Sequence, residues 1–154
     1  MSIAKTFYSL KDAENRTSEL YSLISLNTSL KYPELSILFE NLAEDEKLHA
    51  KQIDMMRRLF VETEDTFVSD PKTDQMIDAY PSFIEDFKKY FLLNFEKMNV
   101  GDILNIAIET ENNLVEKHRQ LFIQTIDPGI KKLFESLNFG DLEHLKRLQN
   151  FELK

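Results

Sequence analysis

Apolar side chains recur every three or four residues along four stretches of the chain, the spacing that places them on one face of an α-helix. These stretches span residues 3–29, 34–61, 100–126 and 129–151. Helix-capping signals mark the starts of the third and fourth stretches: Asn99 and Asp102 form a capping-box pattern, and Asp127 is followed by Pro128. Strand-like alternation extends over no more than a few residues. The pattern therefore predicts an all-α chain.

The segment between the second and third stretches, residues 62–98, predicts a crossover with an extra helix. Asp70 followed by Pro71 is typical of an N-cap and a first helical residue, and Pro81 predicts the start of another helical stretch. The crossover is long enough to run the length of the other helices. Its aromatic side chains need a surface to cover, either on the same chain or on a second subunit.

Each of the four long stripes is apolar at both ends and polar in the middle. In the second stripe, Phe39 and Leu42 lead to Glu46 and His49, and apolar residues resume at Ile53. Helices with one apolar face each bury it against one another. We therefore expect a four-helix bundle that forms a single domain over residues 1–154, with a polar belt inside its core.

The chain is internally duplicated. Glu46 and His49 correspond to Asp141 and His144, 95 residues further on, while Glu14 corresponds to a glutamate 97 residues further on. The two offsets differ by two residues, which indicates that the loop between the first two helices is two residues longer than its counterpart in the second half. Two helical hairpins related by a pseudo-twofold axis would produce this duplication.

The composition excludes several classes of function. The chain has 27 acidic and 19 basic side chains and a net charge of −8, which disfavours binding to nucleic-acid phosphates. It has no cysteine, which excludes disulfides, thiolate catalysis, Cys-ligated zinc and iron–sulfur centres. It shows neither the apolar run of a signal peptide nor the roughly 18 apolar residues of a membrane span, so we expect it in the cytoplasm.

We expect the functional site at the level of the bundle where the apolar stripes become polar. Four carboxylates stand at mid-stripe, one per helix, and two histidines each follow an acid by three residues, which makes them neighbours on one helix face. Four buried carboxylates cannot be ionised together without cations, and no Lys or Arg lies at the centre of a stripe. Two divalent ions would balance four negative charges, and oxygen with nitrogen ligands suits iron or manganese, with zinc possible. The predicted metal ligands are Glu14, Glu46, His49, Glu111, Asp141 and His144.

The competing interpretation is a solvated acidic face with two ordinary histidines. An acid three residues before a histidine is weak evidence alone, because acids make up 27 of 154 residues. The stronger evidence is that all six residues fall in phase with the apolar stripes, at matched depths and within a repeat. A solvated face would leave four acids flanked by Phe, Leu and Ile without partners.

These residues resemble the ferritin-like di-iron carboxylate proteins, and among them the rubrerythrin-like group, here without a rubredoxin domain. In that class two helices each provide a Glu and two others each provide Glu-x-x-His. The single acids stand in AENRTSELY and AIETENNLVEKH, and the paired motifs in LFENLAEDEKLHAKQ and LFESLNFGDLEHLKR. The resemblance covers all four bundle helices and matches the crossover poorly. It implies a ferritin-like four-helix bundle.

The resemblance also implies a role for each ligand. Glu46 and Asp141 would bridge two metal ions. Glu14 and Glu111 would be terminal ligands, and each histidine would bind one metal. No catalytic side chain is expected beyond these ligands.

Several positions depart from the family pattern. Asp141 replaces the usual Glu and is one methylene shorter, which strains a bridging role. Leu114 stands where rubrerythrins proper have a further Glu ligand, which puts the ligand exchange of their peroxidase cycle in question. Lys47 stands where bacterioferritins have a haem-ligating Met, so no haem is expected. Because the rubredoxin tail is absent, electrons would come from an external donor.

Tyr21 and His118 lie seven positions after the terminal glutamates. In the family this position is usually a Tyr that is hydrogen-bonded to the opposite Glu. This implies that Tyr21 orients Glu111. His118 has three open roles: the same role toward Glu14, a seventh metal ligand, or a plain core histidine. Thr17 either hydrogen-bonds a metal-bound water or is an ordinary helix threonine.

The resemblance implies a non-haem di-iron, or mixed manganese and iron, oxidoreductase that reduces hydrogen peroxide or dioxygen, an activity connected with oxidative stress. Two alternatives stay open at this point: ferrous iron oxidation coupled to iron storage or delivery, and a non-catalytic dimetal-binding bundle. We expect two iron ions and a homodimer, without nucleic-acid or membrane partners.

Overall fold

The computed structural model describes residues 2–60 and 70–154, and within these ranges the chain forms five α-helices and one short 3-10 turn without a β-strand. The start of the predicted crossover, residues 62–69, and the predicted last residue of the second helix, Val61, lie outside the described residues. The elements are α1 (Ile3–Thr28), α2 (Pro33–Phe60), α3 (Pro71–Asn94), η2 (Phe95–Lys97), α4 (Val100–Gln124) and α5 (Pro128–Gln149).

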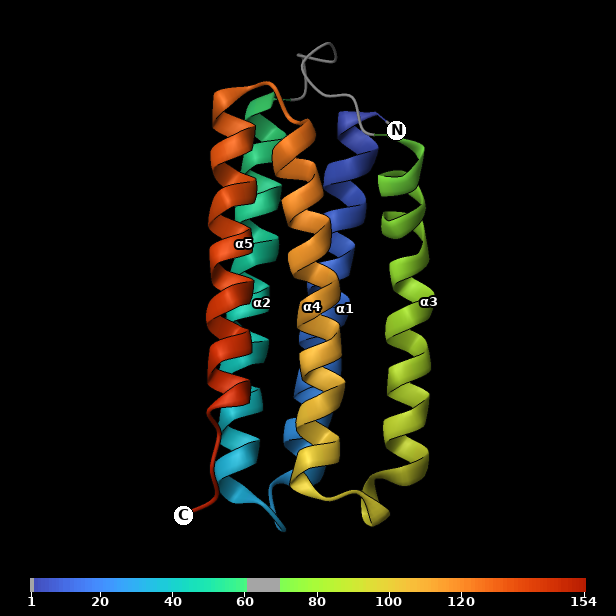
Figure 1. The fold of residues 1–154 in the computed structure, drawn as a ribbon, viewed down its shortest axis with the longest axis vertical. Helices are drawn as coiled ribbons and strands as arrows, with labels where there is room; N and C mark the ends of the chain where they lie inside the picture. Colours follow the sequence, from blue (N-terminus) through green and yellow to red (C-terminus); the bar gives the residue numbers. More distant parts are fainter. Residues whose placement is uncertain (1, 61–69) are drawn as a thin grey trace.

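The helices form two hairpins and one helix outside them. Helix α1 packs most extensively against α2, and α4 against α5, while α2 and α5 make a smaller contact between the hairpins. Helix α3 lies along α1 and α4 on the outside of the bundle (Figure 1). This arrangement confirms the all-α ferritin-like bundle of two hairpins with a crossover helix.

Side-chain caps fix the starts of the later helices where the sequence predicted them. Asp70 accepts a hydrogen bond from the Thr73 backbone N–H at 2.7 Å, and Asp127 accepts one from that of Ile130 at 3.0 Å. Asn99 at the start of α4 completes a reciprocal capping box. These caps satisfy backbone N–H groups that have no partner within the helix.

Pro81 lies inside α3, so the prediction that a separate helix begins there is wrong. Ile77 before it and Ile84 after it are both buried in the core. Burial of one face on both sides of the proline keeps the segment in one helix, because tertiary packing supplies most of the stability of helices in proteins.

The apolar core is divided into two clusters. One cluster includes Tyr21, Phe39 and Leu114, and the other includes Phe7 and Phe134. The division follows from stripes that are apolar at both ends and polar in the middle. The polar belt therefore lies inside the bundle between two apolar clusters that exclude water.

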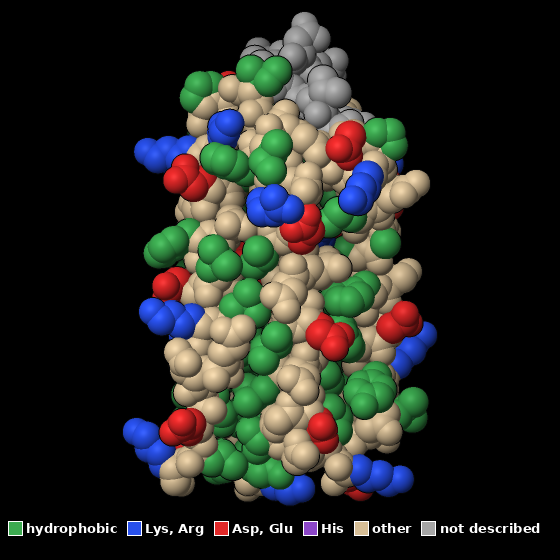
Figure 2. Space-filling model, in the orientation of Figure 1, with side chains coloured by type: hydrophobic (Ala, Val, Ile, Leu, Met, Phe, Trp, Pro, Cys, Tyr) green, Lys and Arg blue, Asp and Glu red, His purple; other side chains and the backbone are tan. Residues whose placement is uncertain are grey.

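The surface carries charges of both signs. On the face drawn in Figure 2, basic and acidic side chains are interspersed with hydrophobic ones, without a large area of one sign. Among the described residues no helix combines the length and the hydropathy that a bilayer crossing requires.

Candidate metal centre

The fold brings the six predicted ligands to one level of the bundle interior, where they form the polar belt. Helix α1 contributes Glu14, α4 contributes Glu111, and α2 and α5 each contribute an acid and a histidine. All four carboxylate residues have an exposed fraction of 0%. The side chain of His144 is 2% exposed and that of His49 is 12% exposed.

These residues form two groups that share one carboxylate. The four-residue group consists of Glu46, Glu111, Asp141 and His144, and the three-residue group consists of Glu14, Glu46 and His49. Within each group the potential ligand atoms all lie within 4.8 Å of one another. Glu46 belongs to both groups, as a bridging ligand would, whereas Asp141 belongs to one.

Both imidazoles turn Nδ1 toward the carboxylates. His49 Nδ1 lies 3.1 Å from Glu46 Oε2 and 3.8 Å from Glu14 Oε2. His144 Nδ1 lies 2.9 Å from Glu46 Oε1 and 3.2 Å from Glu111 Oε1. The two rings stack with their centroids 5.5 Å apart. The arrangement offers one nitrogen ligand to each group.

The buried carboxylates are short of hydrogen-bond partners. Among the described residues, the oxygens without a well-directed hydrogen bond are both of those in Glu14, Oε1 of Glu46, Oε2 of Glu111 and Oδ1 of Asp141. Imidazole nitrogens lie near two of them, 2.9 Å from Glu46 Oε1 and 3.2 Å from Glu14 Oε1. An unsatisfied buried charged group costs several kcal/mol. Divalent cations would satisfy these oxygens, so the residues present fit a dimetal centre of oxygen and nitrogen ligands.

Burial and crowding change the acidity of the belt. Burial, with the neighbouring Glu14 and Glu111, raises the pKa of Glu46 well above its ordinary value. Burial also raises the pKa of Asp141 to about 6, although the positive charge of His118 acts in the opposite direction. Without metal, the belt therefore retains protons that a divalent ion would displace.

The histidines respond to the same carboxylates. Burial lowers their pKa, but the hydrogen bonds and charges of Glu14 and Glu46 outweigh it and raise the pKa of His49 to about 11. For His144, burial is outweighed by Glu111 and Glu46, and the pKa rises to about 10. In the metal-free protein these protonated rings take the place of cations.

Tyr21 and His118 contact the belt from the same level of their helices. The Tyr21 hydroxyl donates a hydrogen bond to Glu111 Oε1 at 2.8 Å, the contact that the family resemblance implies. His118 Nε2 lies 3.2 Å from Glu14 Oε1, and its Nδ1 bonds Asp141 Oδ2 at 2.5 Å. His118 belongs to neither ligand group and instead connects two of the carboxylate residues.

The hydroxyl group of Thr17 is hydrogen-bonded to groups within the protein. It donates to the Ala13 carbonyl at 2.8 Å and shares a hydrogen bond of 2.5 Å with the Tyr80 hydroxyl on α3. Helix α3 is thereby fixed to α1 one turn beyond Glu14.

Lys117 is a buried basic side chain that lies beside the traced stripe and that the sequence analysis did not single out. It is fully buried on α4, and its Nζ lies 3.3 Å from the centroid of the Tyr80 ring without a hydrogen-bond partner in the described part of the chain. Burial lowers its pKa to about 7, although Glu14 and Asp141 act to raise it. The internal repeat contained the signal, because Lys117 occupies the position of the buried Leu20.

Asp45 is a second residue that the sequence analysis missed. Its Oδ2 lies 3.2 Å from His144 Nε2 and accepts a hydrogen bond from Arg147. Partial burial acts to raise the pKa of Asp45, but Arg147 and His144 lower it below its ordinary value. Asp45 directly precedes Glu46, and this adjacency was the available signal.

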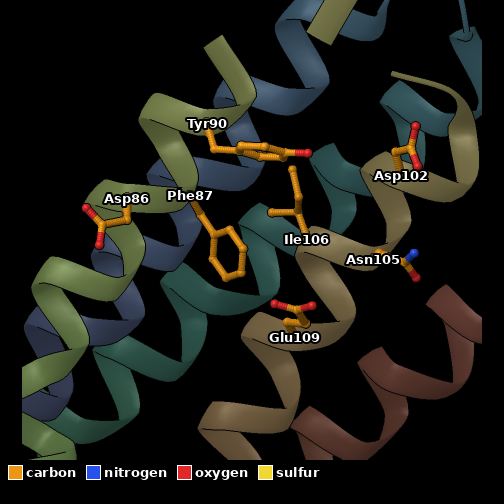
Figure 3. Close-up of a pocket in the computed structure, with 7 residues that line it drawn as sticks. All are labelled: Asp86, Phe87, Tyr90, Asp102, Asn105, Ile106 and Glu109. Carbon is orange, nitrogen blue, oxygen red and sulfur yellow. The ribbon is translucent and has the colours of Figure 1, made fainter. Parts of the chain in front are cut away.

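A surface groove between α3 and α4 is separate from the belt (Figure 3). It has a volume of about 410 Å³, and Phe87 and Tyr90 line it together with Ile106 and Glu109. None of the six predicted ligands lines this groove. The belt is therefore an interior site and not the floor of this groove.

A four-helix bundle with a buried belt of carboxylates and histidines defines the class of ferritin-like dimetal-carboxylate proteins. Within that class, the family model described as Rubrerythrin matches residues 11–152. The chain belongs to the rubrerythrin family, whose members bind a dimetal centre. No curated protein and no solved structure matches it at a significant level.

Proposed function

We propose that this chain is a non-haem di-iron, or mixed manganese and iron, oxidoreductase that reduces hydrogen peroxide or dioxygen with electrons from an external donor. The observation that carries the proposal is the set of fully buried carboxylates around Glu46, several of whose oxygens lack a well-directed hydrogen bond, with one imidazole nitrogen facing each group.

The side chains have distinct tasks in this proposal. The carboxylates and the two Nδ1 atoms hold the ions, and Tyr21 keeps Glu111 turned toward the belt through its hydrogen bond. The apolar clusters above and below exclude bulk water, which strengthens electrostatic interactions inside. When bound, the two metal ions would supply two electrons, which with two protons convert one hydrogen peroxide into two waters.

Rapid mixing tests this activity. The chain is loaded with ferrous iron without oxygen and mixed with peroxide in a stopped-flow instrument, beside free ferrous iron at the same concentration. We expect oxidation at least about tenfold faster than that of free iron, because two ions are held together for a two-electron reaction. Oxidation at the rate of free iron would contradict the proposal.

Two variants provide the comparison. Glu111→Ala removes a buried carboxylate of the four-residue group and is expected to abolish the acceleration. Glu143→Ala removes an exposed acid from the same helix as Asp141 and is expected to retain it. Equal rates in both variants would mean that the belt is not the site of oxidation.

The alternatives differ in measurable properties. Iron storage requires a shell assembly, so a solution mass near the homodimer that we propose would count against it. A non-catalytic bundle would bind metal without turnover, and Asp141→Glu, which restores the usual family ligand, would then create activity that the parent lacks.

A further inference from the structure

The two histidines of the belt are equivalent in the internal repeat but differ in what lies behind them. His49 and His144 stand 95 residues apart, and both turn Nδ1 inward. At the same offset, Asp45 on α2 corresponds to Gly140 on α5. One ring therefore has an acid behind it and the other has a residue without a side chain.

Behind His144 lies a fixed partner. Asp45 Oδ2 is 3.2 Å from Nε2 of His144, and Arg147 holds the same oxygen. A carboxylate that accepts the outer N–H of an imidazole fixes its tautomer, orients the ring and makes the inner nitrogen a better ligand. His144 is thus held in place for binding through Nδ1.

Behind His49, Gly140 offers no side chain that could serve as such a partner. A Cβ atom added to Gly140 would lie 2.8 Å from His49 Nε2, closer than any side chain could pack. The His49 side chain is 12% exposed, against 2% for His144. The ring stands at the contact between α2 and α5, which is smaller than the contacts within either hairpin.

We propose that the chain binds two metal ions with unequal affinity, a tightly held ion at the four-residue group and a weakly held, exchangeable ion at the three-residue group. The four-residue group has one more ligand and a positioned histidine. The three-residue group has one fewer ligand and an unsupported histidine beside a glycine. This inference rests on the proposed dimetal function.

Titration of the metal-free full chain with cobalt(II) tests the inference, because calorimetry counts the ions and visible absorption reports the geometry around each. We expect two equivalents whose affinities differ by at least about tenfold. Asp45→Asn is expected to weaken the first equivalent by about 10–100-fold and to change its absorption spectrum. That spectral change separates a positioning role from a merely structural one.

Gly140→Ala is the complementary variant. The new methyl group would push the imidazole of His49 aside, and Ala favours a helix interior over Gly, so the fold is retained. We expect the second equivalent to weaken by at least about tenfold and the first to change by less than about twofold. Glu143→Ala, at an exposed position on the same helix, is the matched control and should bind as the parent does.

The outcomes separate this inference from the function on which it rests. A parent chain that takes up no cobalt would overturn both. Two ions of equal affinity would overturn the inequality alone. A folded Gly140→Ala variant that keeps both equivalents unchanged, or that loses the first, would overturn the assignment of the weaker ion to the three-residue group.

Discussion

At the scale of the residue, one buried lysine adds to the charges around the belt. Two of the buried carboxylates, Glu14 and Asp141, act to raise the pKa of Lys117, but burial outweighs them and lowers it to about 7. A positive charge near the ligands stabilises the metal-free belt and opposes a divalent ion. Lys117 therefore adjusts the competition between protons and metal.

Lys117→Leu places the residue of the equivalent repeat position, Leu20, in α4. We expect the affinity for Mn²⁺ to rise by at least about tenfold, because nearby unit charges interact by a few kcal/mol at an effective dielectric constant of about 20. Calorimetric titration of the parent and the variant measures the difference. An unchanged affinity would mean that the ammonium group does not act on the belt.

The hydroxyl of Tyr21 gives a second residue-scale prediction. Tyr21→Phe removes the hydrogen bond to Glu111 and leaves a buried carboxylate oxygen without that donor. We expect the metal-free protein to lose about 1–2 kcal/mol in its free energy of unfolding and the metal affinity to fall by about tenfold. Urea unfolding and metal titration measure the two effects, and no change in either would contradict the assigned contact.

The sequence placed the six belt residues in the interior because each falls in phase with an apolar stripe. It missed Lys117 because the stripe was traced through His118, the next residue in the chain. It missed Asp45 because nothing in helical spacing shows that this side chain reaches His144 on another helix. Contacts between helices depend on packing, which one-dimensional periodicity does not contain.

At the scale of the element, helix starts were predictable and helix continuity was not. Caps act over three or four residues, so Asp70, Asn99 and Asp127 could be recognised from local sequence. Pro81 was read as a helix start by the same local rule. Burial of α3 on both sides of Pro81 overrode it, and that burial depends on α1 and α4.

The cap of α5 is open to a direct test. Asp127→Ala removes the acceptor of the Ile130 backbone N–H, and we expect the free energy of unfolding to fall by about 1 kcal/mol. Chemical denaturation measures it, with Glu152→Ala as a control at an exposed position after the helix. Equal stabilities of the two variants would show that the cap contributes nothing.

At the scale of the whole molecule, the belt ties stability to pH. In the metal-free protein the pKa values of His49, His144 and His118 are raised to about 11, 10 and 9, against about 6.5 in an unfolded chain. The stability that they provide is complete below pH 6.5 and is lost as the pH rises through the folded values. Lys117, with a lowered pKa, acts in the opposite direction but is one group against three.

We therefore expect the melting temperature of the metal-free protein to fall between about pH 6.5 and 9. Metal affinity should rise over the same interval, because ions displace the protons of the belt. Calorimetric scans and metal titrations at both pH values check the two trends. A metal-free protein that becomes more stable toward pH 9 would contradict the protonated histidines.

The belt also accounts for part of the net charge of −8. Four of the acids are in the interior, so part of the apparent acidity belongs to the belt and not to the surface. Two bound divalent ions would bring the formal charge to −8 + 4 = −4. The bundle itself was predictable from the sequence because its four stripes and their duplication are strong and redundant signals.

Anomalous diffraction from crystals grown with ferrous iron tests the central claim most directly. Data collected above and below the iron absorption edge locate the ions without reference to activity. The account predicts two peaks inside the bundle, one at the four-residue group and one at the three-residue group, with Glu46 between them. Crystals whose anomalous peaks lie only at the surface, or that show none in the belt, would contradict it.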